Sequence, residues 1–344
     1  MTENILLLSF LLIPCFLGLL LFFFFKRAKT KGRSKSKLIA GNLLLLLFLL
    51  SILIACGEIY FRFAYDSTES YARTKVTLKW IEKHYQMNSN GLRDSVEEYR
   101  LRRTPGKRRI LFIGDSFTAG HGVPNVEDRF ANIIRKKYPE AETHIFAKNG
   151  MNTDSGLRMI NDLTKQGYEF DEVILVYCLN DSQYLVPGYK QMMRKIFAPP
   201  SPAFLFENSF MLDTLYFRLI IAGNPTISDY HSFVIDTYAG KRWNEHKKRL
   251  KEFSDVIKRS KDGGLTVVTF PFLHSLGENY KFRDAHDSLD QFWRSLGVPH
   301  LDLLPVFEAR RDTRLVVNPH DAHPNEAAHK IAAEAIGSFL DSDR

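Results

Sequence analysis

Residues 110–120 read ILFIGDSFTAG, an apolar run that stops abruptly at Gly-Asp-Ser. A short apolar run bounded by glycine is typical of a buried strand in a parallel sheet. Such a strand delivers the residue that follows it, here Ser116, to the carboxyl edge of the sheet, where open α/β sheets place their ligands. We therefore predict a strand over 109–114 and a functional site beside Ser116.

The sequence around this strand alternates between the patterns of strands and helices. We expect further strands at about 143–147, 172–177, 265–270 and 300–303, and helices at about 126–137, 154–166, 241–260, 284–296 and 325–340. Strands that alternate with helices form a parallel sheet covered on both faces. The predicted fold of residues 108–340 is therefore α/β, a flavodoxin-like parallel sheet of about five strands.

Four groups of polar residues follow predicted strands or precede the last predicted helix. They are Gly114-Asp115-Ser116, Asn149-Gly150, Asn180-Asp181 and Asp321-Ala322-His323. Each group by itself could be a helix cap, an ordinary turn or the start of a helix. Because the carboxyl ends of parallel strands meet at one edge of a sheet, we expect the four groups to lie close together.

Three of these residues are the parts of a nucleophilic acyl-transfer site. A serine is a poor nucleophile until a base takes its proton, so we predict Ser116 as nucleophile and His323 as its base. Asp321 is the predicted acid that holds the imidazole in one tautomer and stabilises the imidazolium.

The remaining polar residues are predicted to stabilise charge during the reaction. Attack on an ester produces an oxyanion, which needs hydrogen-bond donors already in place. The backbone N–H groups of Ser116 and Gly150 and the side-chain amide of Asn180 are the predicted donors. Asp115 and Asp181 are expected to support these loops.

With these four groups in order, residues 88–340 resemble the SGNH/GDSL hydrolase superfamily. The residues that give the superfamily its name correspond here to Ser116, Gly150, Asn180 and His323. The resemblance implies a three-layer α/β/α fold and serine esterase chemistry. The stretch NSNGLR at 88–93 is similar to the membrane-anchored branch of this superfamily.

The chain departs from the superfamily pattern at two positions. The acid more often lies three residues before the histidine, where this chain has His320, whereas Asp321 lies two before it. That spacing is similar to the alginate acetyltransferase-like members. Cys178 stands where a glycine usually precedes the Asn group, and we expect it to pack as a small residue.

Neither a metal nor another cofactor is expected. His320 and His329 flank His323, and three histidines within ten residues could indicate a metal site. However, His329 falls inside the last predicted helix, and no carboxylate or cysteine cluster has the spacing of metal ligands. The three cysteines of the chain form no disulfide framework.

Two apolar segments, 5–25 and 38–56, are about long enough to cross a bilayer. Seven of the twelve residues at 26–37 are Lys or Arg, and short loops this basic stay in the cytoplasm. We therefore expect two spans in the cytoplasmic (inner) membrane and an extracytoplasmic C-terminal part. The segment LIACG at 53–57 is similar to a lipoprotein cleavage box, so lipidation of Cys56 stays open. Buried core helices and a cleaved signal peptide fit less well, because nothing else could cover these segments and the first four residues are not basic.

The expected organisation is a membrane hairpin at 1–57, a juxtamembrane lead-in at 58–107 and the hydrolase-like domain at 108–340. The net charge of +8 is concentrated in the hairpin, which leaves a net charge of only +2 elsewhere and argues against nucleic-acid binding. Residues 182–240 fit no β/α unit and are rich in aromatic side chains. We expect this insertion to be either a lid or groove wall over the serine or a small satellite core.

These observations predict a membrane-tethered serine esterase that acts on ester groups, with O-acetyl groups of envelope or exported carbohydrate as the leading substrate. An O-acetyltransferase would use the same acyl-serine, and the sequence does not separate the two. A non-catalytic carbohydrate-binding or assembly protein with the same fold is the alternative from another class. The expected partners are an ester-bearing small molecule or glycan and the lipid bilayer. The sequence identifies no protein partner.

Overall fold

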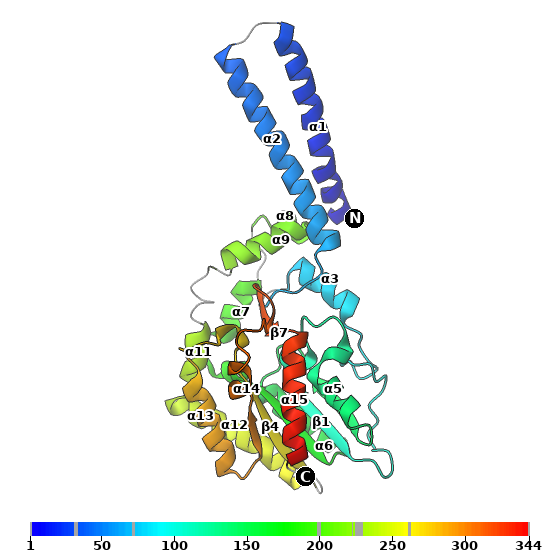
Figure 1. Ribbon diagram of the computed structural model, residues 1–344, viewed down its shortest axis with the longest axis vertical. Coiled ribbons are helices and arrows are strands. Elements are labelled where there is room, and N and C mark those ends of the chain that lie inside the picture. The colour runs from blue at the N-terminus through cyan, green and yellow to red at the C-terminus, as the bar shows by residue number, and fades with distance from the viewer. Residues whose placement is uncertain are drawn as a thin grey trace. The chain divides into compact units, whose positions relative to one another are not determined.

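The computed structural model describes residues 2–30, 34–70, 73–197, 201–221, 223, 230–260 and 263–342. The chain divides into two compact units. The first comprises Met1–Trp80 and Ile196–Asn224, and the second comprises Ile81–Lys195 and Pro225–Arg344. Each unit is described by itself below, and Figure 1 labels their elements.

The second unit contains a five-stranded sheet in the order β2-β1-β3-β4-β5. The strands are β1 (Arg109–Gly114), β2 (Glu142–Ala147), β3 (Glu172–Cys178), β4 (Gly264–Phe270) and β5 (His300–Asp302). Every neighbouring pair is parallel. The predicted α/β fold with a flavodoxin-like parallel sheet is confirmed, because this order is the flavodoxin order. β1 is buried along its whole length, as an apolar strand in the middle of a covered sheet must be.

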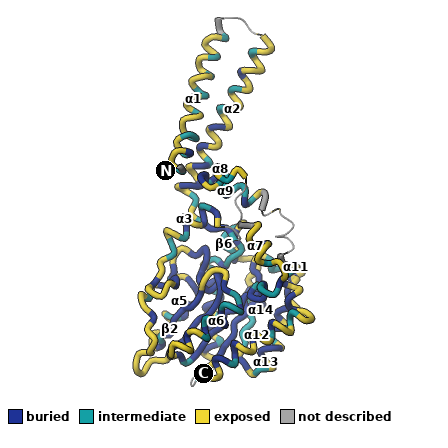
Figure 2. The backbone as a smooth tube through the Cα atoms, turned by 180° about the vertical axis from the view of Figure 1, so that it is seen from behind, coloured by how far each residue is buried: buried dark blue, intermediate teal, exposed yellow. Residues whose placement is uncertain are grey.

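Helices cover both faces of this sheet. The main ones are α5 (Phe130–Lys137), α6 (Thr153–Lys165), α12 (Gly240–Arg259), α13 (Arg283–Ser295) and α15 (Glu326–Ser342). The chain runs from β1 outward to β2 through α5, and then back past β1 to β3 through α6. Because both connections are right-handed, this change of direction places α5 and α6 on opposite faces of the sheet. α15 packs against α5, and α12 packs against α6. Figure 2 shows the buried residues concentrated between these layers.

The helix predicted at 126–137 is interrupted. Val126–Asp128 form a 3-10 turn, Arg129 has extended backbone, and α5 begins at Phe130. The interruption lies at Arg129, whose buried side chain donates to the Asn132 side chain within the first turn of α5 at 2.8 Å. The helical prediction was therefore wrong at this point.

Shorter elements complete the second unit. They are α4 (Ser116–Ala119), η3 (Leu179–Leu185), α11 (Tyr230–Thr237), η5 (Leu273–Ser275), α14 (Leu304–Glu308) and an antiparallel hairpin of β6 (Val316–Asn318) and β7 (Asp321–Pro324). The sequence did not predict this hairpin. It matters because β7 carries the aspartate and histidine predicted as acid and base.

The first unit is built around two long helices, α1 (Thr2–Thr30) and α2 (Lys35–Ile59). Both are long and apolar enough to cross a membrane by length and composition, and most of their side chains are exposed in the chain alone. The expected spans at 5–25 and 38–56 fall inside them. Residues 31–33 of the expected basic loop lie outside the described residues.

Short helices pack at the end of α2. They are η1 (Tyr60–Ala64), α8 (Ala203–Asn208), α9 (Phe210–Tyr216) and η4 (Phe217–Ile221). The buried carboxylate of Glu58 pairs with Arg62 at 2.8 Å and accepts from the Ser209 hydroxyl at 2.7 Å and the Met211 N–H at 3.0 Å. A carboxylate that accepts from the first N–H groups of a helix favours that helix end, so Glu58 fixes the start of α9.

The expected insertion at 182–240 contributes to both units, because residues 196–224 belong to the first. Two further helices, α3 (Lys75–His84) and α7 (Tyr189–Phe197), cross the boundaries between the units. Parts of the insertion, at 198–200, 222 and 224–229, lie outside the described residues. Its role as a lid or groove wall stays a prediction.

Arg93 holds the loop that follows α4. Its buried guanidinium donates to the carbonyls of Ala119 (3.2 Å), Gly120 (2.5 Å) and Val123 (2.6 Å). Burial lowers the pKa of Arg93 to about 10, so it stays charged at neutral pH. The NSNGLR stretch of the lead-in therefore contributes the cation that fixes this loop.

We expect Arg93→Met to destabilise the second unit by about 3 kcal/mol or more, because several buried carbonyls lose their donor. In a unit of this size the melting temperature should fall on the order of 10 °C, measured by near-ultraviolet circular dichroism of the full chain in detergent. Arg100→Met is the matched control, because the Arg100 side chain is 82% exposed. Equal melting of the two variants would contradict this role.

Candidate active site

Each residue of the Gly-Asp-Ser motif at the end of β1 has its own structural role. A Cβ on Gly114 would lie 2.1 Å from the Thr118 hydroxyl and 3.0 Å from the Val176 carbonyl, so only glycine fits. The Asp115 side chain accepts from the Phe117 N–H at 2.9 Å and caps α4. Ser116 is thereby presented at the first position of α4, at the carboxyl end of β1.

The structure brings Ser116, His323 and Asp321 together. The His323 Nε2 atom lies 2.9 Å from the Ser116 hydroxyl. The other ring nitrogen, Nδ1, lies 2.5 Å from the Asp321 carboxylate, which also accepts from the His323 backbone N–H at 3.0 Å. In this arrangement the hydroxyl donates to Nε2 and Nδ1–H donates to the carboxylate, which is the tautomer that a general base requires.

The environment favours a charged form of His323. Burial alone would lower the pKa of this histidine, but the Asp321 carboxylate more than offsets it and raises the pKa above 6.5. The Asp321 side chain is itself fully buried. A buried carboxylate beside an imidazole stabilises the imidazolium that forms when the serine loses its proton.

The predicted oxyanion loops flank the serine. β1 lies between β2 and β3, so the loops after these three strands emerge side by side. Gly150 follows β2 with a left-handed backbone (φ +77°), and Asn180 follows β3 within η3. The backbone amide of Gly150 and the side chain of Asn180 remain proposed donors on this topological ground.

Asp115 and Asp181 are both buried below the serine loop and line one small cavity together with Thr153. Burial raises the pKa of Asp115 to about 6. Burial, with the Asp115 charge as a further cause, raises the pKa of Asp181 well above its usual range. Cys178 is also buried, and burial raises the pKa of its thiol, so it packs as a neutral residue.

Of the described histidines, those near His323 in the sequence do not form a cluster with it in the structure. His320 is exposed, and the buried His329 accepts from the Phe130 N–H at 3.2 Å. Among the described residues, His121, Asp321 and His323 are the group whose ligand atoms, all within 4.8 Å of one another, could hold a metal ion. Two of the three, Asp321 and His323, already contact each other as the predicted acid and base.

Two residues that the sequence did not single out, His121 and Tyr85, extend this network together with Asn149. The His121 Nε2 atom lies 3.6 Å from the second oxygen of Asp321. Asn149 contacts the other ring nitrogen of His121 at 3.0 Å, and the Tyr85 hydroxyl donates to Asn149 at 2.8 Å. His121 directly follows the quoted stretch 110–120, but no spacing rule connects it to the distant Asp321.

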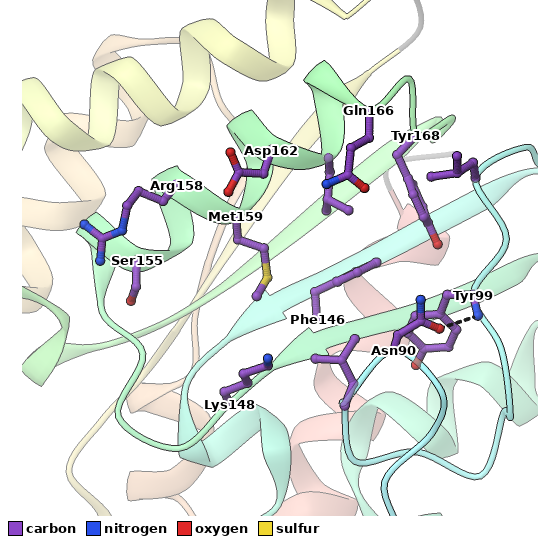
Figure 3. Close-up of a pocket in the computed structure, with 13 residues that line it drawn as sticks. Asn90, Tyr99, Phe146, Lys148, Ser155, Arg158, Met159, Asp162, Gln166 and Tyr168 are labelled. Atoms are coloured by element: carbon purple, nitrogen blue, oxygen red, sulfur yellow. Dashed lines mark hydrogen bonds between the residues drawn. The ribbon is translucent and has the colours of Figure 1, made fainter.

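A separate pocket of about 410 Å³ lies along the edge strand β2 and α6. Its lining does not include Ser116, Asp321 or His323. Figure 3 shows Lys148, Ser155 and Arg158 toward one end and Tyr99, Tyr168 and Asn90 toward the other. Lys148 immediately precedes Asn149 and Gly150, so the pocket begins beside one of the proposed oxyanion loops.

The raised pKa of His323 gives a pH prediction. The base acts only when neutral, so kcat/KM should fall as the pH drops through a midpoint above 6.5. Asp321→Asn removes the charge that raises this pKa, so the midpoint should move down while the rate falls by about 10⁴. Asp284→Asn, an exposed acid on α13, is the control and should change neither. An unchanged midpoint in Asp321→Asn would show that another group sets the pKa.

Comparisons with known proteins identify a family and several similar structures. The profile of the GDSL-like Lipase/Acylhydrolase family matches residues 112–331, and no curated protein matches the chain. An extracellular lipase from Streptomyces rimosus is similar at 13% identity and a TM-score of 0.47, over 68% of this chain and 99% of that chain. An acetyl xylan esterase from Geobacillus stearothermophilus is similar at 16% identity and a TM-score of 0.41, over 68% of this chain and 95% of that chain.

A two-domain esterase active on acetylated mannans is similar at 18% identity and a TM-score of 0.39, over 69% of this chain. The present chain covers about half of that protein, 50% of its length. The family profile, in contrast, covers more than half of the present chain and includes Ser116, Asp321 and His323. The chain therefore belongs to the GDSL-like lipase/acylhydrolase family, and it is a serine ester hydrolase.

Proposed function

We propose that this protein is a membrane-tethered esterase whose catalytic unit lies outside the cytoplasm and removes O-acetyl groups from envelope or exported carbohydrate. The observation that carries the proposal is the continuous contact from Asp321 through His323 to the Ser116 hydroxyl. The two apolar helices α1 and α2 support the tether.

The geometry supports a two-step reaction. Ser116 Oγ attacks the ester carbonyl while His323 Nε2 takes its proton, and the oxyanion is held by the N–H groups of Ser116 and Gly150 and the amide of Asn180. His323 then gives the proton to the departing sugar oxygen, which leaves an acyl-serine. A water molecule, deprotonated by His323, then attacks the acyl group. The bond between the acyl carbon and Ser116 Oγ breaks, His323 returns the proton to Ser116 Oγ, and the acid is released.

Two features support a small acyl group on a larger alcohol. Ser116 is only 9% exposed, and the Phe117 ring packs edge-on against the His323 ring, with the ring centres 5.6 Å apart. An acetyl group needs little room in such a site. The pocket that begins at Lys148 offers amide, hydroxyl and charged groups, which suit the carbohydrate part of the ester.

The acetyl assignment predicts release of acetate. The full chain in detergent should release acetate from an O-acetylated glycan, and Ser116→Ala should lower the rate about 10³-fold or more. Glu278→Ala, an exposed position in the second unit, is the control and should keep the rate. Cleavage of aryl acetates without glycan deacetylation would refute the carbohydrate assignment. Transfer of the acetyl group to a sugar acceptor in place of acetate release would identify a transferase.

The tether predicts a defined topology. The seven basic residues at 26–37 oppose translocation of the loop between the helices. A reporter active only outside the cytoplasm should therefore report when fused after residue 344, and a cytoplasmic reporter fused there should be silent. Insertion of the same reporters within 26–37 should give the reverse result and serves as the control. The opposite pattern would overturn the extracytoplasmic placement.

A further inference from the structure

The second oxygen of the Asp321 carboxylate has its own neighbour. The first oxygen, Oδ1, accepts from His323, whereas the second, Oδ2, faces the Nε2 atom of His121 at 3.6 Å. The rings of His121 and His323 lie 4.5 Å apart, tilted by 57°. Both histidines therefore approach one buried carboxylate, each from the side of a different oxygen.

The neighbours of His121 define its tautomer. The Tyr85 hydroxyl donates to the Asn149 side-chain oxygen at 2.8 Å, so the amide N–H of Asn149 is the group directed at His121 Nδ1, 3.0 Å away. A ring nitrogen that accepts carries no hydrogen, so in the neutral ring the hydrogen lies on Nε2. That N–H is the one that faces Asp321.

We propose that His121 is a positioning residue for Asp321, and that its Nε2–H holds the second carboxylate oxygen while the first orients His323. This inference rests on the proposed acid–base roles of Asp321 and His323. A distance of 3.6 Å is longer than a hydrogen bond, but contacts of catalytic groups are often long before substrate binds and shorten in the complex. A carboxylate held at both oxygens keeps the orientation that the base needs.

The same network reaches the opposite side of the site. Asn149, which sets the tautomer of His121, immediately precedes Gly150, the proposed source of an oxyanion donor. Arg93 donates to the carbonyls of Ala119 and Gly120, the two residues before His121. The chain of contacts from Tyr85 to Asp321 therefore joins the acid of the catalytic group to the oxyanion loop.

The test compares three variants of the full chain on an aryl ester, a substrate that does not depend on the carbohydrate assignment. His121→Phe keeps the ring volume and removes the N–H, so kcat should fall about ten- to a hundredfold with little change in KM, the size expected for one hydrogen bond to a charged group. Labelling of Ser116 by a fluorophosphonate should slow by a similar factor. His121→Gln retains an N–H at a similar reach and should recover most of the loss.

The matched control is His144→Phe, which removes another buried histidine of the second unit, one bonded to Tyr168 at 2.6 Å. It should keep the wild-type kcat and labelling rate. The positioning role is wrong if His121→Phe keeps the wild-type kcat. It is also wrong if the kcat of His121→Gln is no higher than that of His121→Phe. Activity that survives Ser116→Ala would instead overturn the proposed nucleophile, which separates the two failures.

A variant that leaves His121 in place covers the case in which His121→Phe does not fold. Asn149→Leu removes the donor that sets the tautomer, so kcat should fall in the same direction. Nitrogen-15 NMR of the histidine rings should show an unprotonated Nδ1 for His121 in the wild type and a loss of that single tautomer in Asn149→Leu. A protonated Nδ1 in the wild type would contradict the proposal.

Discussion

The parallel pairing of β1 with β2 on one side and β3 on the other is the constraint on which the active site depends. Parallel strands end at the same edge, so the three loops that follow them emerge side by side. Those loops contain Ser116, Gly150 and Asn180. A one-residue slip of β1 would turn its side chains to the other face and move Ser116 away from its neighbours.

Burial then decides the chemistry of the groups assembled there. A charged group inside a protein needs a partner, or its pKa shifts until it is neutral. The Asp321 carboxylate stabilises the charged form of His323, whereas burial raises the pKa values of Asp115 and Asp181 and so favours their neutral forms. Arg93 remains charged among carbonyl oxygens and fixes the loop after the serine. Buried charged groups therefore act both on the pKa values at the site and on the position of the loop after Ser116.

The sequence predicted the sheet closely because its strands are buried apolar runs bounded by polar turns, so β1 was located to the residue. It also predicted Ser116, His323 and Asp321, which the structure brings together. It missed His121 and Arg93, because a single side chain in an irregular loop leaves no periodic signal. The hairpin at 316–324 was missed for a related reason, since its strands are three and four residues long.

The central claim is that Ser116 is the nucleophile activated by His323. The most direct measurement is reaction of the full chain with a fluorophosphonate, followed by intact-mass analysis and peptide mapping. The account predicts one adduct, located on Ser116, that is absent in Ser116→Ala and forms much more slowly in Asp321→Asn. Ester hydrolysis that persists while Ser116 stays unlabelled, or an adduct on another residue, would contradict it.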